Sequence, residues 1–249
     1  MNNKVCIIIP IYKSKFSKRE ETAVINNCNK LKGMSIYFIA PCGINVCYYQ
    51  KVCPKVKIVF FEKNYFKNVA SYNRLMLLGN FYKKFSSYQY MLICQPDVWL
   101  IKGRDELLKF CRLELSYIGA PWVPYYLFHP LNKRDKQFIH RFGNTKLYIG
   151  NGGLSLRKIS DFREILKTHF ILSKMWIQNE DLFYSYVLKK NANKYKMPNI
   201  EIAKRFSLET ECKKIMQKEH IVPFGVHGYD KHYRELPNLF GKGEVIDAM

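Results

Sequence analysis

The 249-residue sequence predicts an α/β domain, with a sheet of largely buried strands and helices packed on it. Apolar runs of strand length alternate with amphipathic segments of helical period through the first part of the chain. These runs are apolar on both faces, which is typical of strands covered by helices on each side of a sheet. No internal repeat or low-complexity linker interrupts the pattern, which favours one domain over residues 1–249.

The first half supplies the clearest strands and helices. The run KVCIIIPIY at 4–12 is apolar, rich in β-branched residues and stopped by Pro10, so it predicts a buried strand. Val24, Cys28 and Leu31 recur at helical spacing within 18–32, and Gly33 follows that helix. Further strands are expected at 35–40, 56–61 and 88–94, and a further helix at 68–78.

After Asp97 the pattern changes to shorter strands and longer loops. Helices are expected near 104–115, 159–170 and 180–190. The change of pattern indicates a soft join near residue 102.

The composition excludes several classes of protein. A hydrophobic content of 48% with 15% aromatic residues excludes a largely disordered chain. No apolar run is long enough to span a bilayer, and the N-terminus lacks the pattern of a signal peptide. The eight cysteines form no CxxC pair, so we expect reduced, packed thiols in a cytosolic protein. The spacing of Cys42, Cys47 and Cys53 argues against a zinc site.

The net charge is strongly positive, with 41 Lys and Arg against 20 Asp and Glu, or +21. Such a surface attracts phosphate, whether in nucleic acid, anionic lipid headgroups or a nucleotide substrate. The basic residues are scattered along the chain, so charge alone does not choose among these partners, and solubility is a further explanation.

The stretch CQPDVWL at 94–100 places a carboxylate where a strand ends. The chain has no GxGxxG and no Walker A motif, which argues against a dinucleotide fold or a P-loop enzyme. Ligands of open α/β sheets bind outside the carboxyl ends of strands. Asp97 is therefore placed to hold a divalent cation that bridges two phosphates. The alternative is that Asp97 only caps a turn.

The stretch LYIGNGGLSLR at 147–157 places three glycines inside an apparent strand. Glycine weakens a strand, so several together indicate a bulge or a close approach by another group. That group is either another part of the chain or a ligand.

Two further stretches carry candidate functional side chains. WIQNEDLFYS at 176–185 places Asn179 as a helix N-cap, with Glu180 and Asp181 in the first turn. VPFGVHGYDKH at 222–232 holds His227 between glycines. The alternative explanations are that the two acids complement the helix dipole and that His227 is an ordinary loop residue.

One more stretch, SYIGAPW at 116–122, ends a strand in Gly-Ala-Pro-Trp. Its indole, Trp122, lies either near a loop or in the core.

Taken in order, the motifs resemble a known family. The order is IIIPIY, YNR, QPD, YIGAPW, GNGGLSLR, NEDLFYS, AKRFSLE and PFGVHGY, over residues 5–229. It resembles a bacterial and viral family of sugar transferases catalogued as a domain of unknown function within the GT-A glycosyltransferase superfamily. YIGAPW, GNGG-SLR, ED-F and FG-HG carry the resemblance. The chain is also distantly similar to the β-1,4-galactosyltransferases.

The resemblance implies a GT-A-type, Rossmann-like mixed sheet and a nucleotide-sugar-dependent transferase. Residues 1–102 would then form the nucleotide-binding half, and 103–249 the acceptor and catalytic half. The donor-binding residues that it implies are Pro10, Ile11, Tyr12, Asn73, Asp97, Asn151, Gly152 and Gly153. The glycines would clear space for substrate.

The resemblance also implies a divalent cation, Mn²⁺ or Mg²⁺, held by Asp97 and the donor diphosphate, with His227 as a second protein ligand or in direct contact with the diphosphate. The usual metal motif is Asp-X-Asp, and this chain has Gln95-Pro96-Asp97, one carboxylate fewer.

The resemblance favours an inverting reaction with a carboxylate base. Inverting relatives place the base on the Asp of a Glu-Asp pair, which is Asp181 here. Glu180 would then hold acceptor hydroxyls or the opposing loop, and the reverse assignment stays open.

The favoured donor is a UDP-sugar, and the acceptor a glycan or lipid-linked sugar in polysaccharide biosynthesis. We expect a cytoplasmic enzyme, peripheral at an anionic membrane surface, without a nucleic-acid partner. Loops 41–54 and 123–146 are expected to select donor and acceptor. The alternatives are a basic nucleic-acid-binding protein, a retaining transferase and a nucleotidyltransferase on a related fold.

Overall fold

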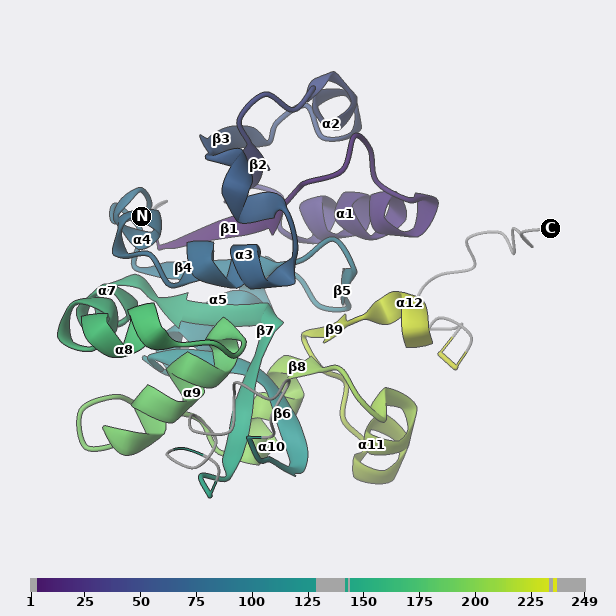
Figure 1. Ribbon diagram of the computed structural model, residues 1–249. Coiled ribbons are helices and arrows are strands. Elements are labelled where there is room, and N and C mark those ends of the chain that lie inside the picture. The colour runs from purple at the N-terminus through teal and green to yellow at the C-terminus, as the bar shows by residue number, and fades with distance from the viewer. Residues whose placement is uncertain (1–3, 129–141, 143, 233–234, 237–249) are drawn as a thin grey trace.

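A computed structural model describes residues 4–128, 142, 144–232 and 235–236 (Figure 1). A six-stranded sheet runs through the molecule in the order β3-β2-β1-β4-β7-β6. The first four of these strands are parallel, and β7 pairs antiparallel with both β4 and β6. The strands are β1 (Val5–Pro10), β2 (Ser35–Pro41), β3 (Lys57–Phe61), β4 (Tyr90–Cys94), β6 (Tyr117–Tyr126) and β7 (Leu147–Lys158).

The central strands are buried because they have a separate core on each face. Successive side chains of a strand point to opposite faces. In β1, Cys6 and Ile8 belong to one apolar cluster, whereas Val5, Ile7 and Ile9 belong to the other. Both sets are almost fully buried, which explains why the run is apolar without alternation.

Helices cover both faces. One core includes side chains of α3 (Val69–Met76), α4 (Gly79–Lys83), α7 (Ile159–Thr168) and α9 (Glu180–Lys190). The other includes side chains of α1 (Lys18–Lys30), α2 (Cys47–Val52), α5 (Arg104–Arg112) and α10 (Ile200–Phe206). Helix α1 begins with a capping box, in which Ser17 and Glu20 each accept a hydrogen bond from the other's backbone N–H.

A second, three-stranded sheet lies beside the main one, in the order β5-β9-β8. Its strands are β5 (Val98–Leu100), β8 (Ser207–Leu208) and β9 (Gly225–His227). The remaining short elements are η1 (Lys63–Phe66), α8 (Phe170–Met175), α11 (Cys212–Glu219) and α12 (Tyr229–His232). This small sheet brings the segment after β4 next to the chain near residue 227.

The predicted fold class is confirmed: a single α/β domain with a mixed sheet flanked by helices. The main sheet takes strands from both sides of the join expected near residue 102. All eight cysteines are free, and no helix within the described ranges is long and apolar enough to cross a bilayer. Of the loops expected to select substrates, 41–54 contains α2, and residues 129–141 and 143 of the other lie outside the described residues.

Candidate active site

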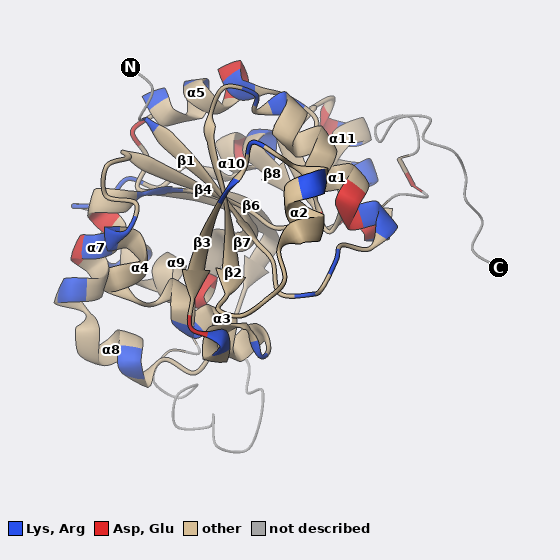
Figure 2. Ribbon diagram, turned by 90° about the horizontal axis from the view of Figure 1, so that it is seen from above, with Lys and Arg blue, Asp and Glu red and all other residues tan. Residues whose placement is uncertain are grey.

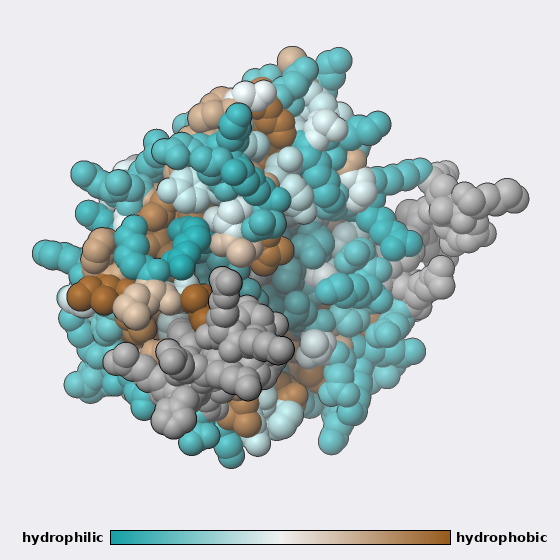
Figure 3. Space-filling model, viewed as in Figure 1, coloured by the Kyte–Doolittle hydropathy of each residue, from teal (hydrophilic) through white to brown (hydrophobic). Residues whose placement is uncertain are grey.

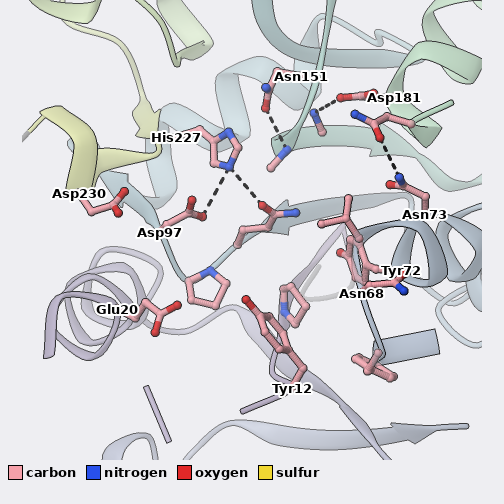
Figure 4. A pocket seen from close by; sticks show the side chains of 18 of the residues that line it. Tyr12, Glu20, Asn68, Tyr72, Asn73, Asp97, Asn151, Asp181, His227 and Asp230 are labelled. Carbon is pink, nitrogen blue, oxygen red and sulfur yellow. Dashed lines mark hydrogen bonds and ion pairs between the residues drawn. The ribbon is translucent and has the colours of Figure 1, made fainter. Parts of the chain in front are cut away.

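A cavity of about 640 Å³ opens at the carboxyl ends of β1 and β4 (Figure 4). Its walls also include the middle of β7, the first turn of α9 and the residues around β9. The predicted site residues that line it are Pro10, Tyr12, Asn73, Asp97, Asn151, Gly152, Gly153, Glu180, Asp181 and His227. Ile11 does not line it, because its side chain is 1% exposed and packs in the core beside α1 and α2. Figure 3 shows the face of the molecule that is hollowed near its centre.

One wall is formed by the chain that leaves β1. The ring of Tyr12 is 54% exposed, and Lys13 places its Nζ atom 5.5 Å from the ring centroid. Lys13 also forms an ion pair of 2.9 Å with Glu20, which lines the same wall. The buried hydroxyl of Tyr72, on α3, has no hydrogen-bond partner among the described residues. This wall therefore offers an open aromatic face together with polar groups.

The glycines of β7 make room for side chains of the site. A Cβ atom on Gly150 would lie 2.1 Å from Ser185 Oγ and 2.5 Å from the ring of Trp122. One on Gly152 would lie 2.8 Å from Glu180 Oε1, and one on Gly153 would lie 2.1 Å from His227 Nε2. The space beside these glycines is thus filled by the chain itself, and the backbone of Gly152 and Gly153 still faces the cavity.

Asp181 lies in the first turn of α9, partly buried at the cavity wall. Its Oδ2 atom accepts a hydrogen bond from Gly152 N–H at 3.1 Å, and its Oδ1 atom accepts one from Leu182 N–H at 2.8 Å. The pKa of Asp181 is raised to about 7, mainly by burial and secondly by the nearby charge of Glu180. The two backbone N–H donors favour the ionised form and oppose this rise. Asp181 therefore exchanges its proton near neutral pH.

Asn179 precedes α9 as predicted, but its side chain does not cap the helix. Its Oδ1 atom instead accepts a hydrogen bond of 3.0 Å from Asn73 Nδ2 on α3. The two amides join α3 to the start of α9 at the edge of the cavity (Figure 4). The local N-cap signal was outweighed by this tertiary contact.

Glu180 and Arg157 form a buried ion pair behind the cavity wall. Glu180 Oε1 accepts from Arg157 Nη2 at 2.9 Å, and the Arg157 side chain is 0% exposed. Tyr82 and Ser155 accept the other hydrogen bonds of the guanidinium. The second oxygen of Glu180 has no partner in the described part of the chain. Because one oxygen of Glu180 is committed to Arg157, Asp181 is the freer of the two acids.

The opposite wall carries His227 between two carboxylates. Its Nε2 atom lies 3.1 Å from Gln95 Oε1 and 3.5 Å from Asp97 Oδ1, and its Nδ1 atom lies 3.2 Å from Glu209 Oε1. Burial opposes the charge on the ring, but Asp97 and Glu209 outweigh it and raise the pKa of His227 to about 9. Burial also opposes the charge on Asp97, but the hydrogen bond and the charge of His227 outweigh the effect of burial, so the pKa of Asp97 is lowered.

The residues around His227 suit part of a divalent metal site. The described ranges contain no group of three or more His, Cys, Asp or Glu side chains placed to hold a metal ion. Asp97 Oδ1 and Gln95 Oε1 are oxygen donors within 3.5 Å of a single imidazole nitrogen at the cavity wall. Mn²⁺ and Mg²⁺ accept oxygen donors and keep several positions for water or phosphate. The donor set therefore fits a cation that is completed by a diphosphate.

Gln95, Arg157 and Glu209, which contact His227 or Glu180, were not among the predicted site residues. Each belongs to a stretch whose motif was quoted, QPD, GNGGLSLR or AKRFSLE. Gln95 and Glu209 contact His227, which lies 132 and 18 positions further along the chain, and Arg157 contacts Glu180, 23 positions further along. Such contacts between distant positions are revealed only by the folded chain.

A family model described as "Protein of unknown function (DUF5672)" matches residues 55–227. A search of curated proteins gave no match. Among solved structures, the galactosyltransferase LgtC in complex with donor and acceptor sugar analogues is similar, with a TM-score of 0.58 and 12% identity over 97% of this chain and 98% of that one. Mouse xyloside xylosyltransferase 1 is also similar, with a TM-score of 0.55 and 11% identity over 90% of this chain and 97% of that one.

A third similar structure is core-mannan synthase A from Aspergillus fumigatus in an Mn/GDP form, with a TM-score of 0.52 and 12% identity over 74% of this chain and 69% of that one. At these identities the likeness concerns the fold, which is of the GT-A glycosyltransferase type.

Proposed function

The chain belongs to the family described as "Protein of unknown function (DUF5672)", and we propose that it is a glycosyltransferase that moves a sugar from a nucleotide-sugar donor to a glycan or lipid-linked acceptor. One observation carries the proposal. In a GT-A fold, a single cavity places an acid with a pKa of about 7, Asp181, opposite a polar cluster suited to a cation and a diphosphate. These are the two requirements of transfer from a nucleotide sugar, a base and a stabilised leaving group.

The nucleotide would lie against the chain after β1, with its base on the open face of Tyr12 and Pro10 beside it. Asp97 and the backbone of Gly152 and Gly153 would then face the diphosphate and the donor sugar, near Asn73 and Asn151. A UDP-sugar is the favoured donor. A distant similarity to the β-1,4-galactosyltransferases is part of the same proposal.

Asp181 would act as general base. In an inverting transfer, the base takes the proton of the acceptor hydroxyl as that oxygen attacks the anomeric carbon, while the nucleoside diphosphate leaves with the electron pair of the broken bond. A pKa near the working pH gives both enough ionised base and enough basicity. Glu180, which lines the same cavity, would hold acceptor hydroxyls or the opposing loop.

Asp97 and His227 would hold Mn²⁺ or Mg²⁺, with Gln95 beside them. A bound cation would neutralise the charge that develops on the departing diphosphate. The Mn/GDP form of core-mannan synthase A, a protein of similar fold, supports this proposal.

Attachment to an anionic membrane surface would bring the enzyme to lipid-linked acceptors in polysaccharide biosynthesis. The net charge is +21, and Figure 2 shows the basic residues spread over many elements. Helix α8 adds exposed apolar side chains, Phe170 at 57%, Ile171 at 73% and Met175 at 65%. Cations attract acidic headgroups, and apolar side chains enter the interface.

The direct test of the proposal is incubation with a panel of nucleotide sugars, in which released nucleoside diphosphate is measured with and without a chelator. We expect slow hydrolysis of at least one donor, faster release with acceptor sugars, and loss of both after chelation. The anomeric configuration of the product, read by NMR, decides between inversion and retention. A protein that only binds nucleic acid would release no nucleoside diphosphate.

A further inference from the structure

The small sheet places three polar side chains at one of its ends. His227 ends β9 and pairs with Val98, the first residue of β5, so Asp97 directly precedes the paired residue. Leu208 ends β8 and pairs with Val226 in parallel, so Glu209 emerges beside His227. Strand register therefore sets Asp97 on one side of the imidazole and Glu209 on the other.

Glu209 is held by both of its carboxylate oxygens. Oε1 lies 3.2 Å from His227 Nδ1, and Oε2 accepts a hydrogen bond from Asn151 Nδ2. The first contact is an ion pair whose angles miss those of a regular hydrogen bond, and Nδ1 has no other partner among the described residues. The backbone oxygen of Glu209 accepts a further bond of 2.6 Å from His232 Nε2, which fixes this point of the chain.

We infer that Glu209 is a positioning residue that turns His227 so that its Nε2 atom faces the cation held by Asp97. The inference rests on the metal site of the proposed function. An imidazole binds a metal through one nitrogen, and a carboxylate that accepts from the other nitrogen fixes both the tautomer and the ring orientation. Here Nε2 faces Gln95 and Asp97 at the cavity, whereas Nδ1 faces Glu209.

The same residue connects the two walls of the site. Asn151, which donates to Glu209, accepts a bond of 3.1 Å from Gly153 N–H, and the neighbouring Gly152 N–H donates to Asp181. The position of His227 is thus coupled through Glu209 to the glycine segment of β7 that also holds Asp181.

The contacts explain why a carboxylate is needed at this position. Its two oxygens face two N–H donors, one from His227 and one from Asn151. Glutamine has the same shape but only one acceptor oxygen, and its NH₂ group would face a donor. Glu209→Gln therefore loses one of the two contacts without a change of volume. Glu211→Gln is the matched control, because Glu211 is exposed and its one ion pair among the described residues is with exposed Lys214.

The test measures Mn²⁺ binding by the full chain, as the loss of the free-ion EPR signal at a saturating concentration of UDP. Mutation of residues that orient a metal ligand weakens metal binding by about 10- to 100-fold, which is the effect expected for Glu209→Gln. Affinity for UDP without metal and the thermal unfolding midpoint should stay at wild-type values. Glu211→Gln should bind Mn²⁺ as the wild type does.

Equal Mn²⁺ affinity of Glu209→Gln and wild type would overturn the inference, as would equal weakening by Glu211→Gln or a wild type that binds no Mn²⁺. Donor turnover is scored separately. Weakened Mn²⁺ binding in a protein that consumes no nucleotide sugar would support the role of Glu209 and contradict the proposed function.

Discussion

Gly153 shows how tightly the site is packed at the level of single residues. A Cβ atom at this position would lie 2.1 Å from His227 Nε2, which is closer than any real contact, so the ring would have to move. We expect Gly153→Ala to lower donor turnover roughly 100-fold, because a displacement of about 1 Å of an aligned group has effects of that size. Gly79→Ala is the control, since, apart from its chain neighbours and its own helix, no atom of the described residues lies within 4 Å of its Cβ position. Wild-type turnover in Gly153→Ala would show that His227 does not need its present position.

With Asp181 as the proposed general base, we expect the reaction to depend on pH. Its pKa is raised from 3.8 to about 7, chiefly by burial, and a general base works only when it is ionised. Turnover should therefore rise with pH up to about 7 and level off above it. An acid with an unshifted pKa would give a flat profile over this range. The measurement is the rate of nucleoside diphosphate release at saturating donor from about pH 5 to pH 9.

Single residues were predictable from sequence where a local signal marked them. Asp97 follows a buried strand, and Asp181 lies in the first turn of a strongly apolar helix, so both stood out. Ile11 belongs to the same motif as Tyr12 but points into the core, because neighbouring residues of an extended chain face opposite sides. Glu209 gave no signal of its own, since its importance lies in contacts with His227 and Asn151 across the fold.

At the level of elements, the ion pair between Arg157 and Glu180 joins β7 to α9 and so fixes the helix that carries Asp181. Glu180→Gln would leave the buried guanidinium without its counter-charge. Removing one partner of a buried pair costs about 3–5 kcal/mol in the free energy of unfolding. The exposed pair of Glu211 and Lys214 supplies the comparison, and breaking it should cost about 0–1 kcal/mol. Urea unfolding of wild type, Glu180→Gln and Glu211→Gln measures the loss in the free energy of unfolding for the buried pair and for the exposed pair. Equal costs would mean that the buried pair does not hold α9.

The strands of the main sheet were predictable because each is a continuous apolar run covered on both faces. The sheet of β5, β9 and β8 was not, because its strands have only two or three residues and carry no periodic pattern. Its stability depends on pairing between segments more than 100 residues apart in sequence, such as Val98 and His227. Yet this sheet brings Asp97, His227 and Glu209 together, so the contacts among them, and the part played by Glu209, could not be located before the fold was known.

At the level of the whole molecule, the charge and the exposed side chains of α8 predict binding to anionic vesicles. Figure 3 shows apolar side chains on the side of the molecule where α8 lies in Figure 1. Binding should weaken as salt rises, because the headgroup attraction of about 1 kcal/mol per basic residue is screened. Ile171→Glu should weaken vesicle binding more than Val222→Glu does. Val222→Glu is the control, because it makes the same change in charge at another exposed apolar side chain. Co-sedimentation at low and high salt is the measurement. Equal binding to neutral and anionic vesicles would contradict the prediction.

The central claim is that this cavity transfers a sugar with Asp181 as base. The most direct measurement is the rate of nucleoside diphosphate release from nucleotide sugars by wild type and Asp181→Asn, side by side, with donor binding measured in parallel. Asparagine keeps the shape but cannot take a proton, and general-base help is worth about 10²- to 10⁴-fold in rate. We predict release by the wild type, a loss of that size in Asp181→Asn, and equal donor affinity in the two. A wild type that releases nucleoside diphosphate no faster than Asp181→Asn would contradict the account.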